Sequence, residues 1–365
     1  MDKFGYGMDM SKNMNQKLDF SGAIYRRMMQ QLSVIDRFKG NWEALELKQS
    51  KHLKELRKIA TIESIGSSTR IEGATLSDKE VDELLKSIKI KKLTSREQQE
   101  VMGYYEALQV ILDNYTELEI SRRYIHQLHG ILLKHSTKDE HHKGQYKTLS
   151  NQVAANYPDE TRRTIFRTTE PHLTSKEMDT LLKWTKQRFE KADIHPVMVT
   201  AVFVYEFLSI HPYQDGNGRL SRLLTTLFLM RQGYGFVQYV SFEHIIEERK
   251  EDYYRSLMEG QQNRYKETER IDSWIVFFLD CLVTLIRRLE AKYETYSKLT
   301  KELNERQEQI IEFISKRKKV RISEVAEAFK EHSRNTLKKD LAYLADEGLL
   351  IKTGERKGTR YHYKK

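Results

Sequence analysis

The residues best suited to chemistry lie in one short segment, His211-Pro212-Tyr213-Gln214-Asp215-Gly216-Asn217-Gly218-Arg219-Leu220-Ser221-Arg222. Its two glycines let backbone N–H groups turn toward a ligand. The helix expected from Gly218 to Arg231 would present its positive N-terminal end at the same place. The segment therefore predicts a cradle for an anion such as phosphate.

Charged side chains complete this predicted cradle. Arg219 and Arg222 are three residues apart, hence on one face of the expected helix, where two guanidinium groups can bind successive phosphates. Asp215 supplies a hard oxygen ligand, which suits one Mg²⁺ shared with phosphate oxygens. His211 is the nearby group whose pKa suits accepting a proton near neutral pH.

The segment resembles the signature of the Fic family, His-Pro-Phe-x-Asp/Glu-Gly-Asn-Gly-Arg with a second arginine three residues on. Eight of nine positions match, and Tyr213 replaces the usual Phe. The resemblance implies transfer of AMP from ATP to a Tyr, Thr or Ser hydroxyl of a target protein, or of the chain itself, with release of pyrophosphate.

The resemblance also assigns a role to each matching residue. His211 would deprotonate the hydroxyl and Asp215 would hold magnesium. The cradle for the phosphates of ATP would be Gly216, Asn217 and Gly218. Arg219 and Arg222 would neutralise the charge that builds on the leaving pyrophosphate.

Two further regions acquire a role from the same resemblance. Tyr253, Tyr254 and Gln261 lie where similar proteins place adenine and ribose contacts, although two adjacent tyrosines are equally typical of core packing. A hairpin containing residues 151–155 is similar to the family's flap, which would bind the target backbone as an added strand.

A second motif lies upstream, Ser68-Thr69-Arg70-Ile71-Glu72-Gly73. Ser68 and Glu72 are four residues apart, on one face of a helix that Gly73 can terminate. The motif resembles the inhibitory helix of some Fic proteins, in which Glu72 would pair with Arg222 and occupy the γ-phosphate position. This implies an auto-inhibited enzyme, and one whose site could also reverse the modification with Glu72 orienting a water.

The rest of the sequence favours a mainly α fold around these motifs. All four prolines fall between residues 158 and 212, which leaves long stretches free to be helical. Apolar spacing and capping residues predict helices over 42–65, 77–88, 95–114, 121–135, 175–192, 196–209 and 218–231. Strands over 145–155 and 161–169 around the turn residues 156–160 predict the hairpin.

From Glu305 the pattern changes to helix, helix-turn-helix and β-hairpin, the order of a winged helix. Residues 305–365 hold 16 Lys or Arg against 10 Asp or Glu, so most of the net charge of +10 is concentrated there. The cations Arg334, Lys338 and Lys339, with Asn335, fall in the expected recognition helix, and others (Lys352, Arg356, Lys357 and Arg360) fall on the wing. They predict DNA binding, with protein interaction or dimerisation as the alternative.

These patterns predict three regions: an N-terminal helical region over 1–105 with the inhibitory motif, a Fic catalytic core over 106–295, and a winged helix over 300–365. We expect a Fic-fold helical bundle with a β-hairpin flap. A single cysteine, Cys281, excludes an intramolecular disulfide framework and suggests a reducing compartment. We expect a cytoplasmic protein with no membrane partner, because the longest apolar run covers 13 residues and contains Asp280.

Two readings remain open from the sequence. The first is the auto-inhibited adenylyltransferase, which uses ATP and Mg²⁺ and, like many similar proteins, could form a homodimer. The second is a DNA-binding transcriptional regulator whose core senses a nucleotide without transferring anything. The complete set of expected catalytic residues favours the first.

Overall fold

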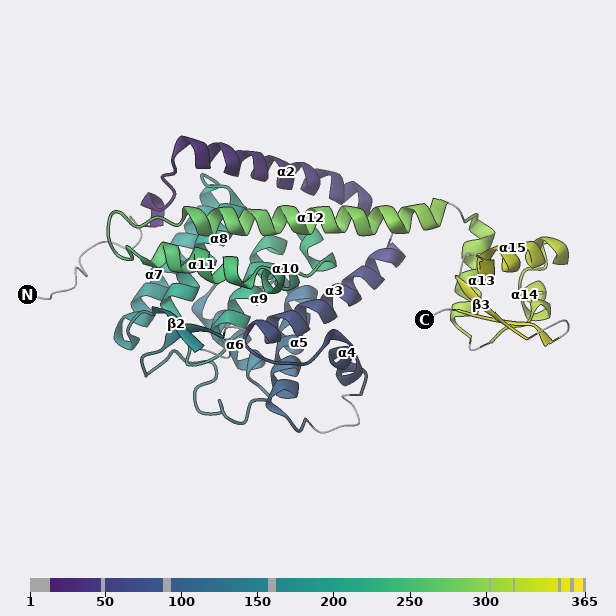
Figure 1. Ribbon diagram of the computed structural model, residues 1–365, viewed down its shortest axis with the longest axis horizontal. Coiled ribbons are helices and arrows are strands. Elements are labelled where there is room, and N and C mark those ends of the chain that lie inside the picture. The colour runs from purple at the N-terminus through teal and green to yellow at the C-terminus, as the bar shows by residue number, and fades with distance from the viewer. Residues whose placement is uncertain are drawn as a thin grey trace, which may run out of the picture. The chain divides into compact units, whose positions relative to one another are not determined.

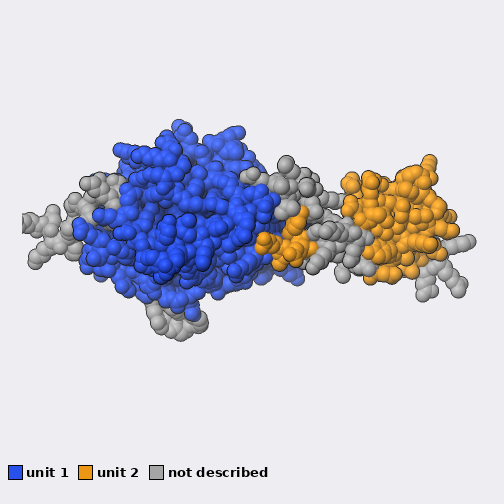
Figure 2. All heavy atoms as spheres, turned by 90° about the horizontal axis from the view of Figure 1, so that it is seen from above, with its two compact units in different colours: residues 1–289 blue, residues 290–365 orange. Residues whose placement is uncertain are grey.

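The computed structural model describes residues 14–46, 50–87, 93–156, 162–301, 303–317, 319–346, 349–354 and 358–363. Within these ranges, the side chains of 43–46, 50–52, 154–156, 162–164 and 295–301 are not described. The chain divides into two compact units, Met1–Leu289 and Glu290–Lys365, which Figure 2 colours separately. Each unit has its own core.

The first unit is a body of helices with one small hairpin (Figure 1). Its elements in chain order are α2 Gly22–Glu46, α3 Ser50–Ile71, α4 Asp78–Ser87, α5 Arg96–Asn114, α6 Arg122–Leu132, β1 Gln152–Asn156, β2 Arg162–Arg167, α7 Pro171–Lys191, α8 Pro196–Ile210, α9 Asn217–Arg231, the 3₁₀-helix η1 Gly235–Tyr239, α10 Phe242–Glu248, α11 Lys250–Gln261 and α12 Asp272–Lys301, which extends into the second unit.

Helices α8 and α9 form the centre of this body. Every residue of α8 from Val197 to Ile210 is buried, as is typical of a helix that is apolar all round. It packs against α7 on one side and α9 on another, and α9 in turn contacts α5, α3 and η1. The loop that joins α8 to α9 carries the His211–Arg222 motif, so two buried helices fix both ends of that loop.

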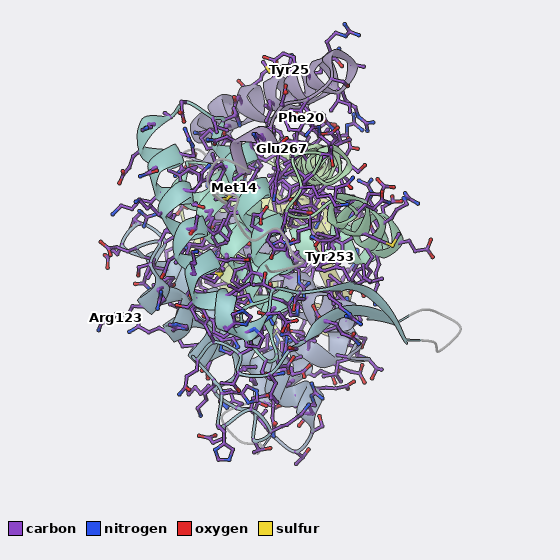
Figure 3. The ribbon with its side chains drawn as sticks, turned by 90° about the vertical axis from the view of Figure 1, so that its left-hand side faces the viewer. Met14, Phe20, Tyr25, Arg123, Tyr253 and Glu267 are labelled. Atoms are coloured by element: carbon purple, nitrogen blue, oxygen red, sulfur yellow. The ribbon has the colours of Figure 1, made fainter. Side chains whose placement is uncertain are left out.

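Helix α2 covers the outside of the body beside α12 (Figure 1), where Arg27 and Gln31 bind the carboxylate of Asp280. Figure 3 shows Tyr25 on the outer side of α2, where it is 55% exposed, and Tyr253 inside the body, where it is 3% exposed.

Several helices begin where the sequence places a capping residue. Ser95 caps α5 in a reciprocal capping box with Gln98, and Ser121 caps α6. Ser77 and Glu80 exchange hydrogen bonds at the start of α4, as predicted. At α8, His195 is the N-cap and Pro196 the first helical residue, because proline lacks the N–H that would be unsatisfied there.

Three element predictions need correction. The single helix predicted over 42–65 is two helices, since α2 ends at Glu46 and α3 begins at Ser50. Of the apolar positions predicted for it, Leu45 and Leu47 lie outside the described side chains, and the side chain of Ile59 is 38% exposed. Helix α7 begins at Pro171 rather than 175, because this proline takes the first helical position. The strands of the hairpin are shorter than predicted, and residues 145–151 are irregular backbone with bends instead. The predicted turn 157–160 lies outside the described residues.

The hairpin of the first unit is antiparallel, with Gln152 opposite Arg167 and Asn156 opposite Arg162. Its register shifts between Val153 and Ala154, which is a β-bulge. Val153 and Phe166 are opposite each other and buried, so one face of the hairpin packs on the helical body.

The second unit is a winged helix, as predicted. Its elements are α13 Glu305–Ser315, α14 Ile322–Ala328, α15 Arg334–Asp346, β3 Leu350–Thr353 and β4 Arg360–Tyr363. The strands pair antiparallel, and Val320 adds an isolated bridge to Tyr361. Its core includes the fully buried Ile310, Leu337 and Leu341.

Helix α15 is held against α13 by Asp340, whose carboxylate accepts from Arg306 at 2.6 Å and from Gln307 at 3.0 Å. In the part of the chain that the structure describes, no helix combines the length and the apolar character needed to cross a bilayer.

Candidate active site

His211 is the residue at which α8 ends. Its backbone has φ +54°, in the left-handed region that side chains other than glycine rarely adopt, and its N–H still donates to the carbonyl of Phe207. The imidazole Nδ1 lies 3.2 Å from the carbonyl of Leu208, so Nδ1–H donates there and Nε2 keeps its lone pair. Such strain is typical of functional sites.

The imidazole of His211 is held neutral. Burial and the nearby charge of Lys147 lower the pKa of His211 to about 4, against the smaller raising effects of Glu72 and Asp215. A neutral imidazole with a free Nε2 lone pair can accept a proton at pH 7. This is the state that a general base requires.

The loop after His211 is fixed by its own side chains. The amide of Asn217 accepts from the N–H of Tyr213 at 2.8 Å and donates to its carbonyl at 2.7 Å, so the loop closes on itself. The side chain of Asn217 thus fixes the shape of this loop. Tyr213 is fully buried and stacks on His129 with ring centres 3.8 Å apart.

The two histidines around Tyr213 are both hydrogen-bonded within the protein. His126 Nδ1 lies 2.9 Å from the hydroxyl of Tyr213. His129 accepts from the N–H of Gly144 at Nδ1, and its Nε2–H donates to the carbonyl of Asp215 at 3.0 Å. Both side chains therefore support the loop.

The N-terminus of α9 lies where the sequence predicts an anion cradle. Gly216 is its N-cap with φ +79°, a conformation that glycine adopts without strain. At Gly218 a Cβ atom would collide with Oε1 of Glu72, so this glycine lets a carboxylate lie against the helix end. An anion is stabilised there by the helix dipole and free N–H groups.

Arg219 and Arg222 are both buried, at 2% exposure each. Arg222 donates to the hydroxyl and the carbonyl of Ser68, at 2.8 and 2.9 Å. Among the described residues, Nε and Nη1 of Arg219 and Nη1 of Arg222 have no hydrogen-bond acceptor. Buried guanidinium groups with unused donors at a helix N-terminus fit a polyanionic ligand such as a triphosphate.

The anion that binds Arg222 in this structure is Glu72, as predicted. Its Oε1 lies 2.8 Å from Nη2 of Arg222, and the ion pair raises the pKa of Arg222. Glu72 follows the last residue of α3, and Gly73 has φ +107°. The left-handed glycine ends the helix and leaves the carboxylate directed at the cradle.

Asp215 offers one carboxylate oxygen for a metal. Its Oδ1 accepts from the N–H of Gly216 at 2.8 Å, whereas among the described residues Oδ2 has only long contacts, to Arg219 and Arg96 at 3.4 and 3.5 Å. These cations keep the pKa of Asp215 below its usual value, so the group is ionised. A single accessible carboxylate oxygen beside a phosphate cradle fits Mg²⁺ that takes its other ligands from phosphates and water.

The predicted nucleotide-contact residues lie close to this site, but they pack into the core. Tyr253 and Tyr254 are 3% and 8% exposed and contact each other edge to face. The amide nitrogen of Gln261 donates to the hydroxyls of Tyr205 and Ser209 on α8. Contact of these three residues with a nucleotide stays a prediction.

Four residues that the sequence did not single out belong to this site. Lys147 is buried beside His211, Glu100 lies 3.6 Å from Nη1 of Arg219, and Lys250 is half-buried with its charge close to Glu72 and Arg222. Arg70 lies within the upstream motif, and its guanidinium binds Glu247 of α10 in a bidentate pair at 2.6 and 2.9 Å. Sequence spacing gives no signal for the first three, because tertiary packing brings them to the site.

The fold and the site are similar to those of Fic-domain proteins. Residues 119–229 match the Fic/DOC family, and residues 306–355 match the DeoR-like helix-turn-helix domain. The chain thus contains a region similar to the Fic/DOC family, followed by a C-terminal winged helix.

Curated proteins are similar to about half of the chain. The chain is 31% identical over 188 residues to the protein adenylyltransferase Fic of Aedes aegypti and 28% identical over 184 residues to that of Drosophila willistoni. Each match covers 50% of this chain and 34% of the relative. The chain therefore spans about a third of the length of these relatives.

Solved structures share the fold. A Fic family protein from Desulfovibrio desulfuricans G20 superposes with a TM-score of 0.65 at 21% identity, over 95% of this chain and 98% of that one. Fic-1 of C. elegans gives a TM-score of 0.59 at 22% identity, over 75% of this chain and 74% of that one.

Proposed function

We propose that this chain is an auto-inhibited protein adenylyltransferase, which transfers AMP from Mg-ATP to a hydroxyl side chain of a target protein and of itself. One observation carries the proposal: the carboxylate of Glu72 lies in an anion cradle against Gly218 and pairs with Arg222 at 2.8 Å. A site built for phosphate is filled by an internal anion. The names of the curated relatives support the same activity.

The reaction follows from the side chains of the loop. Nε2 of His211 takes the proton of the target hydroxyl, whose oxygen attacks the α-phosphorus of ATP while the bond to the β-phosphate oxygen breaks. Pyrophosphate leaves, and Arg219, Arg222 and the N-terminus of α9 neutralise its charge. Mg²⁺ bound at Asp215 would shield the phosphate charges.

Inhibition follows from charge and space. The γ-phosphate of ATP and the carboxylate of Glu72 would compete for the same guanidinium of Arg222. ATP that binds while Glu72 stays in place must shift, and a shift of about 1 Å from the aligned geometry can cost roughly 100-fold in rate.

In the first experiment, the wild type, Glu72→Gly and Glu72→Gly/His211→Ala are each incubated with α-labelled ATP and Mg²⁺. The intact mass of each protein is then measured. We expect a gain of one AMP that rises on removal of Glu72 and vanishes without His211. Glu55→Gly, at an exposed position of α3, is the control for loss of a glutamate away from the site, and it should behave as the wild type. A Glu72→Gly variant that labels neither itself nor proteins of a lysate would contradict the proposal.

The same site would remove AMP from a modified protein if Glu72 orients a water molecule toward the phosphodiester. The measurement is release of AMP from a purified modified substrate. We expect release by the wild type, and none by Glu72→Gln, which keeps the size but lacks the negative charge.

DNA binding by the second unit is a second candidate function. Arg334, Asn335, Lys338 and Lys339 are all exposed in the first half of α15, which is where a recognition helix contacts the major groove. Lys352 and Arg360 are exposed on the wing, whereas Arg356 and Lys357 lie outside the described residues.

A gel shift at increasing salt tests this second function. We expect affinity for duplex DNA to fall with salt, and Lys338→Ala/Lys339→Ala to reduce the salt slope by about two, since each lost phosphate contact removes roughly one. The control is Lys191→Ala, which removes an exposed lysine on α7 of the first unit. Salt-independent binding, or no binding at low salt, would contradict DNA binding and favour protein interaction as the function of this domain.

A further inference from the structure

A lysine ammonium is buried between the flap hairpin and the loop that carries His211. Lys147 is 3% exposed, and its Nζ donates to Oδ1 of Asn151 at 2.8 Å, to Oγ1 of Thr168 at 2.9 Å and to the carbonyl of Ile210 at 3.0 Å. An ammonium group has three N–H donors, so all of them are used.

These acceptors come from both ends of the hairpin and from the end of α8. Asn151 directly precedes β1, Thr168 directly follows β2, and Ile210 is the last residue of α8. Thr168 also donates to the carbonyl of Asn151 at 2.9 Å, which closes the base of the hairpin. The ammonium therefore joins three segments that are distant in the sequence.

Lys147 and Asn151 together bind four consecutive carbonyl groups, from the end of α8 into the loop. Nζ of Lys147 binds that of Ile210, and the amide of Asn151 donates to those of His211 and Tyr213, at 3.3 and 2.8 Å. The N–H of Lys147 donates to the carbonyl of Pro212 at 2.8 Å. These bonds hold His211 in its strained left-handed conformation.

We propose that Lys147 is a positioning residue that clamps the flap hairpin to the loop of His211. The clamp fixes the position of the strand that aligns the target hydroxyl relative to the imidazole that deprotonates this hydroxyl. The proposal rests on the function proposed above. A target bound along the flap would otherwise move independently of Nε2 of His211.

The charge of Lys147 gives the clamp a measurable signature. Burial lowers the pKa of Lys147 to about 8, so the group is largely charged at pH 7. The charged groups that act on His211 are Lys147 at the hairpin base, Glu72 after α3 and Asp215 in the loop, and of these Lys147 lowers the pKa of His211. Replacing the ammonium by an uncharged group should therefore raise that pKa.

The first test needs no enzymatic activity. In Lys147→Met, amide hydrogen exchange of residues 152–156 and 162–167 should accelerate about tenfold or more, because the hairpin opens locally once its base is released. An NMR titration should show a higher pKa for the imidazole of His211. Lys191→Met, at an exposed position of α7, should change neither quantity.

Two further variants keep the test decisive if Lys147→Met folds poorly. Thr168→Val removes one acceptor but keeps the ammonium, so it should accelerate hairpin exchange and leave the pKa of His211 in place. Lys147→Arg keeps the charge and several donors, so it should restore the wild-type pKa of His211. Unchanged hairpin exchange in both Lys147→Met and Thr168→Val would overturn the proposal.

Kinetics in the Glu72→Gly background then connect the clamp to transfer. We expect Lys147→Met to lower kcat/KM for the target protein roughly 10- to 100-fold while KM for ATP stays within about twofold, since the target hydroxyl is misplaced and the phosphate cradle is not. An equal loss toward ATP and target would contradict positioning of the flap. If Glu72→Gly transfers no AMP, the proposed function fails, and the exchange and titration results still decide the clamp.

Discussion

At the scale of single residues, the site depends on buried charges. Arg222 is 2% exposed, and its charge is balanced by Glu72 and by two oxygens of Ser68. Removing Glu72 leaves a buried cation that lacks its anion, and such a cation binds phosphate strongly. If Glu72 inhibits transfer as proposed, the same contact also holds the guanidinium of Arg222 where a phosphate would bind.

His211 predicts a pH dependence of stability. Its pKa is about 4 in the folded chain and 6.5 ordinarily. Below pH 6.5 the unfolded chain takes up a proton that the folded chain excludes until about pH 4, so the free energy of unfolding falls as the pH falls through this window. Because the side chain is partly accessible, we expect a loss of about 1–2 kcal/mol between pH 7 and 4.5.

Urea unfolding at several pH values measures this loss in the free energy of unfolding. The loss should be smaller in His211→Ala by about 1–2 kcal/mol rather than absent, because burial also lowers the pKa of His129 to about 4 and this histidine contributes a loss of its own. It should be unchanged in His141→Ala, which removes an exposed histidine. Parallel pH profiles for the wild type and His211→Ala would show that His211 is not held neutral.

At the scale of elements, the proposed inhibition would depend on how the end of α3 is held. Besides its bidentate pair with Glu247 of α10, Arg70 donates to Asp78 of α4 at 2.9 Å. Glu247 also interacts with His244. The last turn of α3, and with it Glu72, is thus fixed to two neighbouring helices two residues before the inhibitory carboxylate.

Glu247→Gln should therefore relieve inhibition in part. The change weakens a charge-assisted bidentate pair but leaves Glu72 and Arg222 in place. We expect AMP transfer to rise several-fold and to stay below that of Glu72→Gly, measured with α-labelled ATP. Glu248→Gln is the matched control, because Glu248 is on the same helix and pairs with Arg288. Equal transfer by both glutamine variants would show that the Arg70 contact does not hold Glu72.

At the scale of the whole molecule, the two units have separate cores. The second unit is stabilised by its own buried residues, among them Ile310, Leu341 and Leu344, all fully buried. Because each unit has its own core, each can unfold separately. A mutation that destabilises one unit should therefore leave the chemistry of the other unit unchanged.

Leu341→Ala tests this independence. The cavity should destabilise the second unit by about 2–5 kcal/mol. We expect one calorimetric transition to move to lower temperature, with the other transition and the AMP transfer of the Glu72→Gly background unchanged. Lys339→Ala, at an exposed position of α15, is the control and should move neither transition. A single transition that shifts as a whole would show that the units unfold together.

The sequence by itself determined the reactive segment, because its residues are close along the chain. The spacing of His211, Gly216, Gly218 and Arg222 across a helix start needs no long-range contact to become a cradle, and the structure places them so. Helix starts with local signals, such as Ser95 and Ser121, were predictable for the same reason. The winged helix also follows from local periodicity and turn residues.

Only the tertiary structure decided which distant residues complete the site. Glu72 is 150 positions from Arg222, and the sequence could pair them only through resemblance. Lys147, Glu100 and Lys250 carry no motif, and a lysine in a sequence is ordinarily a surface residue. Lys147 is buried because the hairpin base and the end of α8 together supply three acceptors for its ammonium. Local spacing sets a helix or a turn, whereas burial and charge pairing depend on the packing of the whole chain.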